Sequence, residues 1–247
     1  MSQIHLSKIS TRAPKNMDKE STKSLTDKIT DELSELQNLL YAESKHAVLI
    51  VIQGMDASGK DGAVKHVFEK LNPQGVLVQS FKEPTAEELA HDFLWRIHQH
   101  SPKKGMIQIF NRSHYEDILI TRVHKMIDDE TAKQRMKAIN DFEQLLHNNN
   151  THILKFYLHV SKEEQTERLH ERLKDPQKQW KYNENDFKEA KLWDIYQKMY
   201  EDCFAYCNDI PWMITPSDQN WYKEYIIASE LHKLLTGLHM RYPGLKK

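Results

Sequence analysis

A short stretch near the start of the chain, "GMDASGKDG" at residues 54–62, constrains the fold more than any other feature. It fits the pattern G-x-x-x-x-G-K, in which glycines let backbone N–H groups curl around a phosphate. The apolar run "AVLIVI" precedes it and a helical pattern follows it, which is the context that this pattern requires. The sequence therefore predicts a phosphate-binding loop between a strand and the positive end of a helix.

The loop supplies most of the candidates for contact with phosphates or a nucleotide. They are Gly54, Met55, Ala57, Ser58, Gly59, Asp61 and Gly62. Lys60 follows the second glycine, where a mobile ammonium group reaches the outer phosphates, and it is a candidate catalytic residue.

Two acids depart from the common form of this loop. Asp61 replaces the Ser or Thr that normally holds Mg²⁺, and Asp56 puts a carboxylate inside a site for polyanions. A metal ion between Asp56 and the phosphates would remove this repulsion, so Asp56 is the candidate metal ligand. The alternatives are a turn-forming role for Asp56 and a helix-start role for Asp61, and for Asp61 we prefer that alternative.

Apolar runs rich in β-branched or aromatic residues recur along the chain, and each is expected to form a strand. They lie at 47–52, 75–81, 106–110, 152–160 and 211–215. Helical patterns separate them, and continuous apolar strands joined by helices favour a parallel sheet covered on both faces. The expected fold class is α/β, a three-layer sandwich with a central parallel sheet of about five strands.

The regions outside this alternation set the expected boundaries. Residues 1–24 are polar and are expected to form an N-terminal arm, either laid over the body or disordered. Apolar residues at three- and four-residue steps from Leu25 to Leu40 predict an amphipathic helix that leads into the first strand. We expect a single domain over 25–240 and a C-terminal tail at 241–247.

A long charged block at 162–208 lies between the fourth and fifth apolar runs. Ser161 and Glu164 have capping-box spacing, and the helix that they open is expected to stop before Pro176. A second helical pattern covers about 187–207. Two charged helices joined by a turn favour a lid over the strand ends, although two ordinary crossover helices fit the same pattern.

A second polar cluster, "IFNRSHYED" at 109–117, leaves the third apolar run. Ligands of open α/β sheets bind beyond the carboxyl ends of strands, so this cluster and the phosphate loop are expected to face one crevice. Arg112 offers a planar fork for phosphoryl oxygens and is a candidate catalytic residue. The other candidates are Asn111, His114 and Tyr115 as phosphate or nucleotide contacts, and Glu116 or Asp117 as a carboxylate for the metal.

Five motifs follow one another along the chain: "GMDASGKDG", "FKEPTAEELAHDFLWRIH", "IFNRSHYED", "SKEEQTERLHERLKDPQKQWK" and "PWMITPSDQNWY". In this order, over about residues 25–235, they resemble the polyphosphate kinase type 2 family. The resemblance implies a P-loop kinase-like core with a helical lid, and phosphoryl transfer between inorganic polyphosphate and a nucleotide. It also implies Mg²⁺ as cofactor, with Mn²⁺ as an alternative, and a homo-oligomer, either a dimer or a tetramer.

By motif, the resemblance assigns catalytic roles to Asp56, Lys60 and Arg112, and places the family's lid arginine at Arg172. Arg168, one helical turn earlier, is expected to contact phosphates or the nucleotide. Many members carry Asp where this chain has Asn111. That departure, together with "HYED", is similar to the subgroup that accepts both nucleoside mono- and diphosphates, with adenine or guanine as the base.

A polyanion also needs a basic path into the site. The candidates by nearness to the motifs are Lys65, His66, Lys82, Arg96 and Arg122. Each of them is equally compatible with an ordinary solvated surface charge.

Charge balance and the absence of targeting signals narrow the class of protein. The chain has 35 basic and 36 acidic residues, which argues against nucleic acid as a partner. Without a signal-peptide pattern or a long apolar run, we expect a cytoplasmic protein with no membrane association. An ATP-dependent nucleoside monophosphate kinase and a nucleotide-binding switch remain as alternatives, although no N-K-x-D motif for a guanine base is present.

Overall fold

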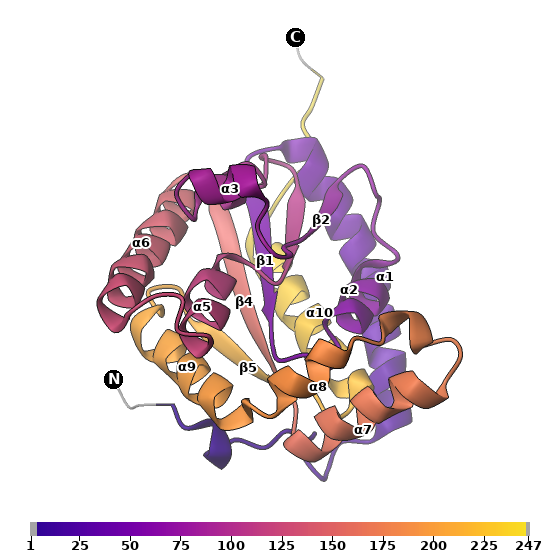
Figure 1. The fold of residues 1–247 in the computed structure, drawn as a ribbon. Coiled ribbons are helices and arrows are strands. Elements are labelled where there is room, and N and C mark those ends of the chain that lie inside the picture. Colours follow the sequence, from indigo (N-terminus) through magenta and orange to yellow (C-terminus); the bar gives the residue numbers. More distant parts are fainter. Residues whose placement is uncertain (1–3, 246–247) are drawn as a thin grey trace.

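The computed structural model describes residues 4–245, which form a five-stranded parallel sheet with helices on both faces (Figure 1). The strands are β1 (Ala47–Gln53), β2 (Val76–Ser80), β3 (Ile107–Asn111), β4 (Thr151–His159) and β5 (Trp212–Pro216). Their order across the sheet is β2-β3-β1-β4-β5, so β1 lies in the middle. All five predicted strands, their parallel arrangement and the α/β class are confirmed.

Strand β1 shows why the sheet is covered on both faces. Its side chains alternate between two apolar clusters, as the period of two in an extended strand requires. Leu49 and Val51 point into one cluster, whereas Val48, Ile50 and Ile52 point into the other. Since every residue of β1 is buried, the phosphate loop that follows it starts from a strand fixed on both faces of the sheet.

One layer of helices packs on the cluster around Ile50. It consists of α1 (Lys19–Glu43), α2 (Lys60–Phe68) and α10 (Asn220–Gly237). The layer on the other face contains α4 (Trp95–His98), α6 (Asp129–Asn148) and α9 (Trp193–Tyr206). Figure 1 shows these two layers on opposite sides of the sheet. The shorter elements are η1 (Leu6–Lys8), α3 (Ala86–Ala90), η2 (His114–Ile118) and α5 (Ile120–Val123).

The first part of the predicted lid segment at 162–208, through α7 (Lys162–Lys174) and α8 (Glu184–Ala190), lies beyond the carboxyl ends of the strands (Figure 1), whereas its last part packs on one face of the sheet. Helix α7 starts at the expected cap, where the Ser161 hydroxyl accepts from the Glu164 amide at 3.2 Å, and it ends before Pro176. The expectation of a single helix at about 187–207 is wrong. The segment is divided into α8 and α9 because α9 packs into the core while α8 has no buried residue; η3 (Gln179–Lys181) precedes α8.

The N-terminal boundary also differs from the expectation. Helix α1 begins at Lys19, where the Asp18 side chain accepts from the Ser21 amide, so the arm is shorter than 1–24. The described part of the arm is laid over the body. The Thr11 hydroxyl donates to Asp218 Oδ2 at 2.7 Å, and the Asp218 amide donates to the Thr11 carbonyl. Residues 1–3 of the arm and 246–247 of the tail lie outside the described residues.

Membrane association was not expected from the sequence. Across residues 4–245, every helix is too short or too polar to cross a lipid bilayer.

Candidate active site

The phosphate loop joins β1 to α2 through residues whose backbone has left-handed geometry. Gly59, directly before α2, has φ +94°, and a Cβ atom at this position would collide with Lys223 Nζ. Ala57 has φ +59°, a conformation that side chains other than glycine adopt at some cost. Such strained backbone at the end of a buried strand is typical of functional loops.

Lys60 folds back onto this loop. Its ammonium group donates to the carbonyls of Gly54 at 2.6 Å and Met55 at 3.1 Å, and the side chain is buried. Burial lowers the pKa of Lys60, and the nearby charge of Arg112 lowers it further, while Asp56 and Glu116 oppose the change. If Lys60 turned outward, its ammonium group would exchange two carbonyl oxygens for a charged phosphate oxygen, which is a stronger hydrogen-bond acceptor.

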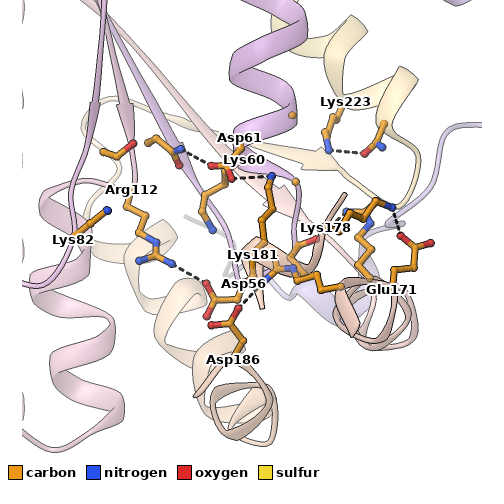
Figure 2. Close-up of a pocket in the computed structure, with 18 of the residues that line it drawn as sticks. Asp56, Lys60, Asp61, Lys82, Arg112, Glu171, Lys178, Lys181, Asp186 and Lys223 are labelled. Atoms are coloured by element: carbon orange, nitrogen blue, oxygen red, sulfur yellow. Dashed lines mark hydrogen bonds and ion pairs between the residues drawn. The ribbon is translucent and has the colours of Figure 1, made fainter. Parts of the chain in front are cut away.

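Arg112 and Asp56 form the centre of the site. Arg112 directly follows β3, its amide donates to the Ile52 carbonyl of β1, and its own φ is +62°. Its guanidinium donates to Asp56 Oδ1 at 2.9 Å (Figure 2). Burial alone would lower the pKa of Arg112, but Glu116 and Asp56 outweigh it and raise the pKa. Arg112 is therefore charged and held over the phosphate loop.

Asp61, the residue in place of the usual hydroxyl, connects three elements. Its Oδ1 accepts from Asn111 Nδ2 at 2.9 Å at the end of β3, and its Oδ2 faces Lys181 Nζ of η3 at 3.4 Å (Figure 2). Burial would raise the pKa of Asp61, but the bond from Asn111 and the charge of Lys181 outweigh it. The helix-start interpretation of Asp61 is thus incomplete, because this carboxylate also ties α2 to the predicted lid.

Arg172 reaches the cleft from α7, on the side of the predicted lid. Its Nη1 donates to Asp186 Oδ2 of α8 at 2.5 Å. Figure 2 shows Asp186 next to Asp56. Burial raises the pKa of Asp186, and the negative charge of Asp56 adds to this effect. Two carboxylates thus face each other, and an arginine is bonded to each of them.

Arg168, one turn before Arg172, points to the loop itself. Its Nε donates to Glu164 Oε1 at 2.8 Å and its Nη1 to the carbonyls of Ala57 and Ser58, each at 3.1 Å. Its Nη2 donates to the carbonyls of Ser217 and Asp218 at 2.8 and 3.0 Å. Arg168 lines the cleft, but protein oxygens occupy all of its donors, so the expected contact with phosphate would require one of these bonds to break.

These groups line one cleft of about 580 Å³. Besides the residues above, its wall contains Lys82 after β2, Lys178 between α7 and η3, and Asn220 and Lys223 of α10. Lys223 donates to Asn220 Oδ1 at 2.7 Å, and burial lowers its pKa to about 7. The cleft is open to solvent, carries positive charge on most sides and has the size of a ligand pocket.

Two predicted contacts of the second cluster do not reach the cleft. His114 and Tyr115 are fully buried, because η2 turns their side chains inward under the sheet. Both bond to Glu143 Oε1 of α6, at 3.1 and 2.8 Å, and Lys155 of β4 donates to Tyr115 Oη and to Glu143 Oε2. These two residues therefore belong to a buried network with Glu143 and Lys155 and do not line the cleft.

Most of the predicted basic path is also wrong. Arg96 is buried, where it donates to Asp117 Oδ2 at 3.3 Å and to the Lys82 carbonyl, and Arg122 pairs with Asp202 at 2.8 Å. Lys65 and His66 are exposed, but neither belongs to the cleft wall. Of the five candidates, only Lys82 lines the cleft.

Other cleft residues were not selected from the sequence. These are Ser80, Phe81, Glu171, Lys178, Lys181, Asp186, Asn220 and Lys223. The run "QKQWKYNEND" gave one usable signal, since lysines concentrated in a predicted lid suit a polyanion. Lys223 and Asn220 gave none, because they read as ordinary residues of the last helix.

The carboxylates of the cleft can be tested against a divalent metal ion. Asp56 uses one oxygen for Arg112, and within residues 4–245 its other carboxylate oxygen accepts no hydrogen bond. Across the same residues no cluster of three or more His, Cys, Asp or Glu side chains is suited to hold a metal. This donor set fits Mg²⁺, which takes one or two carboxylates and completes its shell with phosphates and water. Glu116 does not line the cleft, so Asp186 is better placed than Glu116 to assist Asp56.

Comparison with known proteins agrees with this geometry. The family "Polyphosphate kinase 2 (PPK2)" matches residues 16–242. An AMP/ADP-polyphosphate phosphotransferase from Meiothermus ruber is 47% identical over 213 residues, which cover 85% of this chain and 80% of that protein. An ADP-polyphosphate phosphotransferase from Rhodopseudomonas palustris is 43% identical over 227 residues, with 86% and 78% covered.

A solved structure gives the same result. The crystal structure of polyphosphate kinase 2 from Arthrobacter aurescens matches with a TM-score of 0.96 at 38% identity, over 100% of this chain and 90% of that one.

Proposed function

The chain belongs to the polyphosphate kinase 2 family, and from this premise we propose that it transfers a phosphoryl group between inorganic polyphosphate and a nucleoside mono- or diphosphate. AMP then yields ADP, and ADP yields ATP. The observation that carries the proposal is the convergence of Lys60, Arg112 and Arg172 on a single cleft at the phosphate loop. The names of the two relatives support the same substrates.

The transfer itself needs positioning and charge neutralisation more than covalent chemistry. A terminal phosphate oxygen of the nucleotide attacks the last phosphorus of the polyphosphate chain, and the bond to the bridging oxygen breaks. The shortened chain leaves with that oxygen and its electron pair. Lys60 and Arg112 neutralise the phosphoryl oxygens while charge moves from the attacking to the leaving group.

The lid arginine contributes from the opposite wall. Within residues 4–245 Arg172 is bonded only through Nη1, to Asp186 and the Lys181 carbonyl, so its Nε and Nη2 can contact phosphate oxygens. Closure of α7 and α8 over the cleft would remove water that otherwise hydrolyses the donor. Lys82, Lys178 and Lys181 provide the positive wall along which a polyphosphate chain can lie.

A divalent cation, Mg²⁺ or alternatively Mn²⁺, completes the proposal. Asp56 would hold it, with Asp186 as the second carboxylate, and bound there it would screen the charge between the two substrates. Asp56 also orients Arg112 through the hydrogen bond that its Oδ1 accepts. The homo-oligomer and the cytoplasmic location expected from the sequence stay predictions.

Donor choice tests the proposal. The purified protein is incubated with ADP or AMP, MgCl₂ and long-chain polyphosphate as the only donor, and ATP and ADP are quantified by chromatography. We expect ATP from ADP, and ADP followed by ATP from AMP. If ATP supports phosphorylation of AMP while polyphosphate gives no product, the protein is an ATP-dependent nucleoside monophosphate kinase instead.

A further inference from the structure

The contacts of Arg168 point to a role different from that of the other arginines in the cleft. A guanidinium group has five N–H donors, and the five hydrogen bonds of Arg168 account for each of them. All five acceptors are protein oxygens. No donor is left for a phosphate unless one of these bonds is broken.

Arg172 provides the contrast on the same helix. Only its Nη1 is bonded within residues 4–245, to Asp186 and, at 3.4 Å, to the Lys181 carbonyl. Its Nε and Nη2 therefore remain available to a ligand in the cleft. Two arginines one turn apart thus differ in what they can still bind.

The acceptors of Arg168 explain what it does to the loop. A trans peptide unit is planar, and its carbonyl and N–H groups point in opposite directions. Arg168 and the Ser217 hydroxyl, at 2.7 Å, both hold the Ser58 carbonyl, so the N–H group of Gly59 in the same unit points away from them. Within residues 4–245 this N–H donates to no protein acceptor. It lies directly before the unpaired N–H groups of the first turn of α2.

The far side of Arg168 is anchored to the junction between β5 and α10. Its Nη2 holds the carbonyls of Ser217 and Asp218 there. Asp218 in turn accepts from the Ser161 amide at 2.8 Å and from the Thr11 hydroxyl. Arg168 therefore fixes the loop against elements from three separate parts of the chain.

We propose that Arg168 is a positioning residue for the phosphoryl transfer: it orients the peptide units of Ala57 and Ser58 so that the Gly59 N–H faces the phosphate, and it does not bind substrate itself. Its fork geometry, not only its charge, performs this task. A lysine at the same place has three donors from a single nitrogen atom and cannot span the two pairs of carbonyls. The kinetic part of this inference depends on the proposed function.

The first test measures the loop without any substrate. Hydrogen exchange by mass spectrometry is followed for peptides that cover residues 54–63 in wild type, Arg168→Lys, Arg168→Gln and Lys162→Gln. Lys162 is exposed on the same helix, so its variant controls for the lost charge. We expect exchange in this segment to rise about tenfold in both Arg168 variants and to stay unchanged in the control. A ligand-binding arginine predicts wild-type exchange in all three variants, and that result would overturn the proposal.

A second variant covers the case in which Arg168 substitutions impair folding. Ser217→Ala removes the other donor to the Ser58 carbonyl and leaves every charge in place. We expect a smaller increase in exchange, about threefold, confined to the same segment. Unchanged exchange in Ser217→Ala, together with unfolded Arg168 variants, would contradict the proposed control of this peptide unit.

Measurements of kcat and KM distinguish an arginine that positions the loop from one that binds substrate. With ADP and polyphosphate, we expect kcat to fall at least tenfold in Arg168→Lys and Arg168→Gln alike, because a misplaced loop costs turnover whatever the charge. If Arg168→Lys restores kcat and only Arg168→Gln raises KM for polyphosphate, Arg168 binds substrate and the inference is wrong. If wild type itself lacks activity with polyphosphate, the proposed function fails, and the exchange experiment still decides the role of Arg168.

Discussion

The two walls of the cleft are held together in different ways. The floor, formed by the phosphate loop and Arg112, rests on buried groups: Gln53 donates to Ser113 at 2.9 Å, and Lys155, Glu143, His114 and Tyr115 form a fully buried network beneath it. The lid wall, from α7 to α8, is held by ion pairs between partly exposed side chains, such as Lys178 with Glu171 and Arg172 with Asp186.

This difference indicates which wall can move. Ion pairs near solvent contribute little to stability, so they can be exchanged for substrate phosphates at small cost. A buried ion pair such as Lys155 with Glu143 resists such exchange, because removal of one partner leaves an uncompensated charge. We therefore expect the floor to be preformed and the lid wall to close when a ligand binds.

The largest expected effect lies in the floor. Glu143→Gln removes one charge of the buried pair with Lys155, whose Nζ lies 2.7 Å from Glu143 Oε2. We expect the free energy of unfolding to fall by about 3–5 kcal/mol, measured by urea denaturation. A loss below about 1 kcal/mol would show that the floor is no more firmly held than the lid.

The second largest effect is expected on catalytic activity, when Lys60 or Arg112 is replaced. Lys60→Ala and Arg112→Ala should each cost at least ~3 kcal/mol of transition-state stabilisation, on the scale of one lost oxyanion donor. The measurement is kcat/KM with ADP and polyphosphate, and Lys65→Ala on the exposed face of α2 is the control. Turnover within tenfold of wild type in either variant would contradict the roles of Lys60 and Arg112.

The pH dependence of stability probes Lys223 beside the floor. Burial lowers its pKa to about 7, and Arg168 and Lys60 act in the same direction while Glu224 and Glu164 oppose it. The unfolded chain therefore binds a proton that the folded chain has lost between pH 7 and the ordinary lysine pKa, so stability rises with pH in this window. Relative to Lys223→Met, wild type should gain roughly 2 kcal/mol from pH 7 to 9.

Urea denaturation at both pH values checks this prediction. Lys233→Met, at an exposed position on α10, is the matched control and should show no such difference. A parallel pH dependence in wild type and Lys223→Met would mean that Lys223 is charged in the folded protein at neutral pH.

Two glycines of the loop give a smaller contrast. Gly59→Ala forces a side chain into left-handed backbone and against Lys223, and should destabilise the protein by about 1–2 kcal/mol. Gly62 lies within α2, and an added Cβ atom would meet nothing within 4 Å, so Gly62→Ala should stabilise by about 0.5–1 kcal/mol. Thermal unfolding compares the two, and equal shifts in Tm would refute the argument.

The smallest effect is expected in the lid wall. Asp186→Asn weakens the ion pair of Arg172, and we expect the free energy of unfolding to change by less than about 1 kcal/mol. A large loss of stability would place the lid with the preformed part of the molecule.

The sequence predicted what depends on local pattern. The loop from Gly54 to Lys60 and the strands follow from glycine spacing and apolar runs, which act over a few residues. For His114 and Tyr115 the local pattern gave the wrong prediction. They looked like site residues because they follow a core strand, and only their distant partners Glu143 and Lys155 explain their burial.

Arg168 and Arg172 illustrate the same limit on one helix. Both are arginines on the charged face of a predicted lid helix, and the pattern treats them alike. Their difference arises from the carbonyl groups of residues 57–58 and 217–218, which only the tertiary fold brings to Arg168. Every residue has a backbone carbonyl, so a sequence pattern does not predict which carbonyls will accept from Arg168.

The position of the N-terminal arm has a practical consequence for immobilised catalysts. The Thr11 hydroxyl is bonded to Asp218, and the Asp218 carbonyl accepts from Arg168. The chain leaves α10 at the opposite end of the sheet from the lid (Figure 1). A bead or fusion partner attached after residue 240 would leave both the arm and the closing wall unhindered. Attachment before residue 4 would load the arm that Thr11 joins to Asp218.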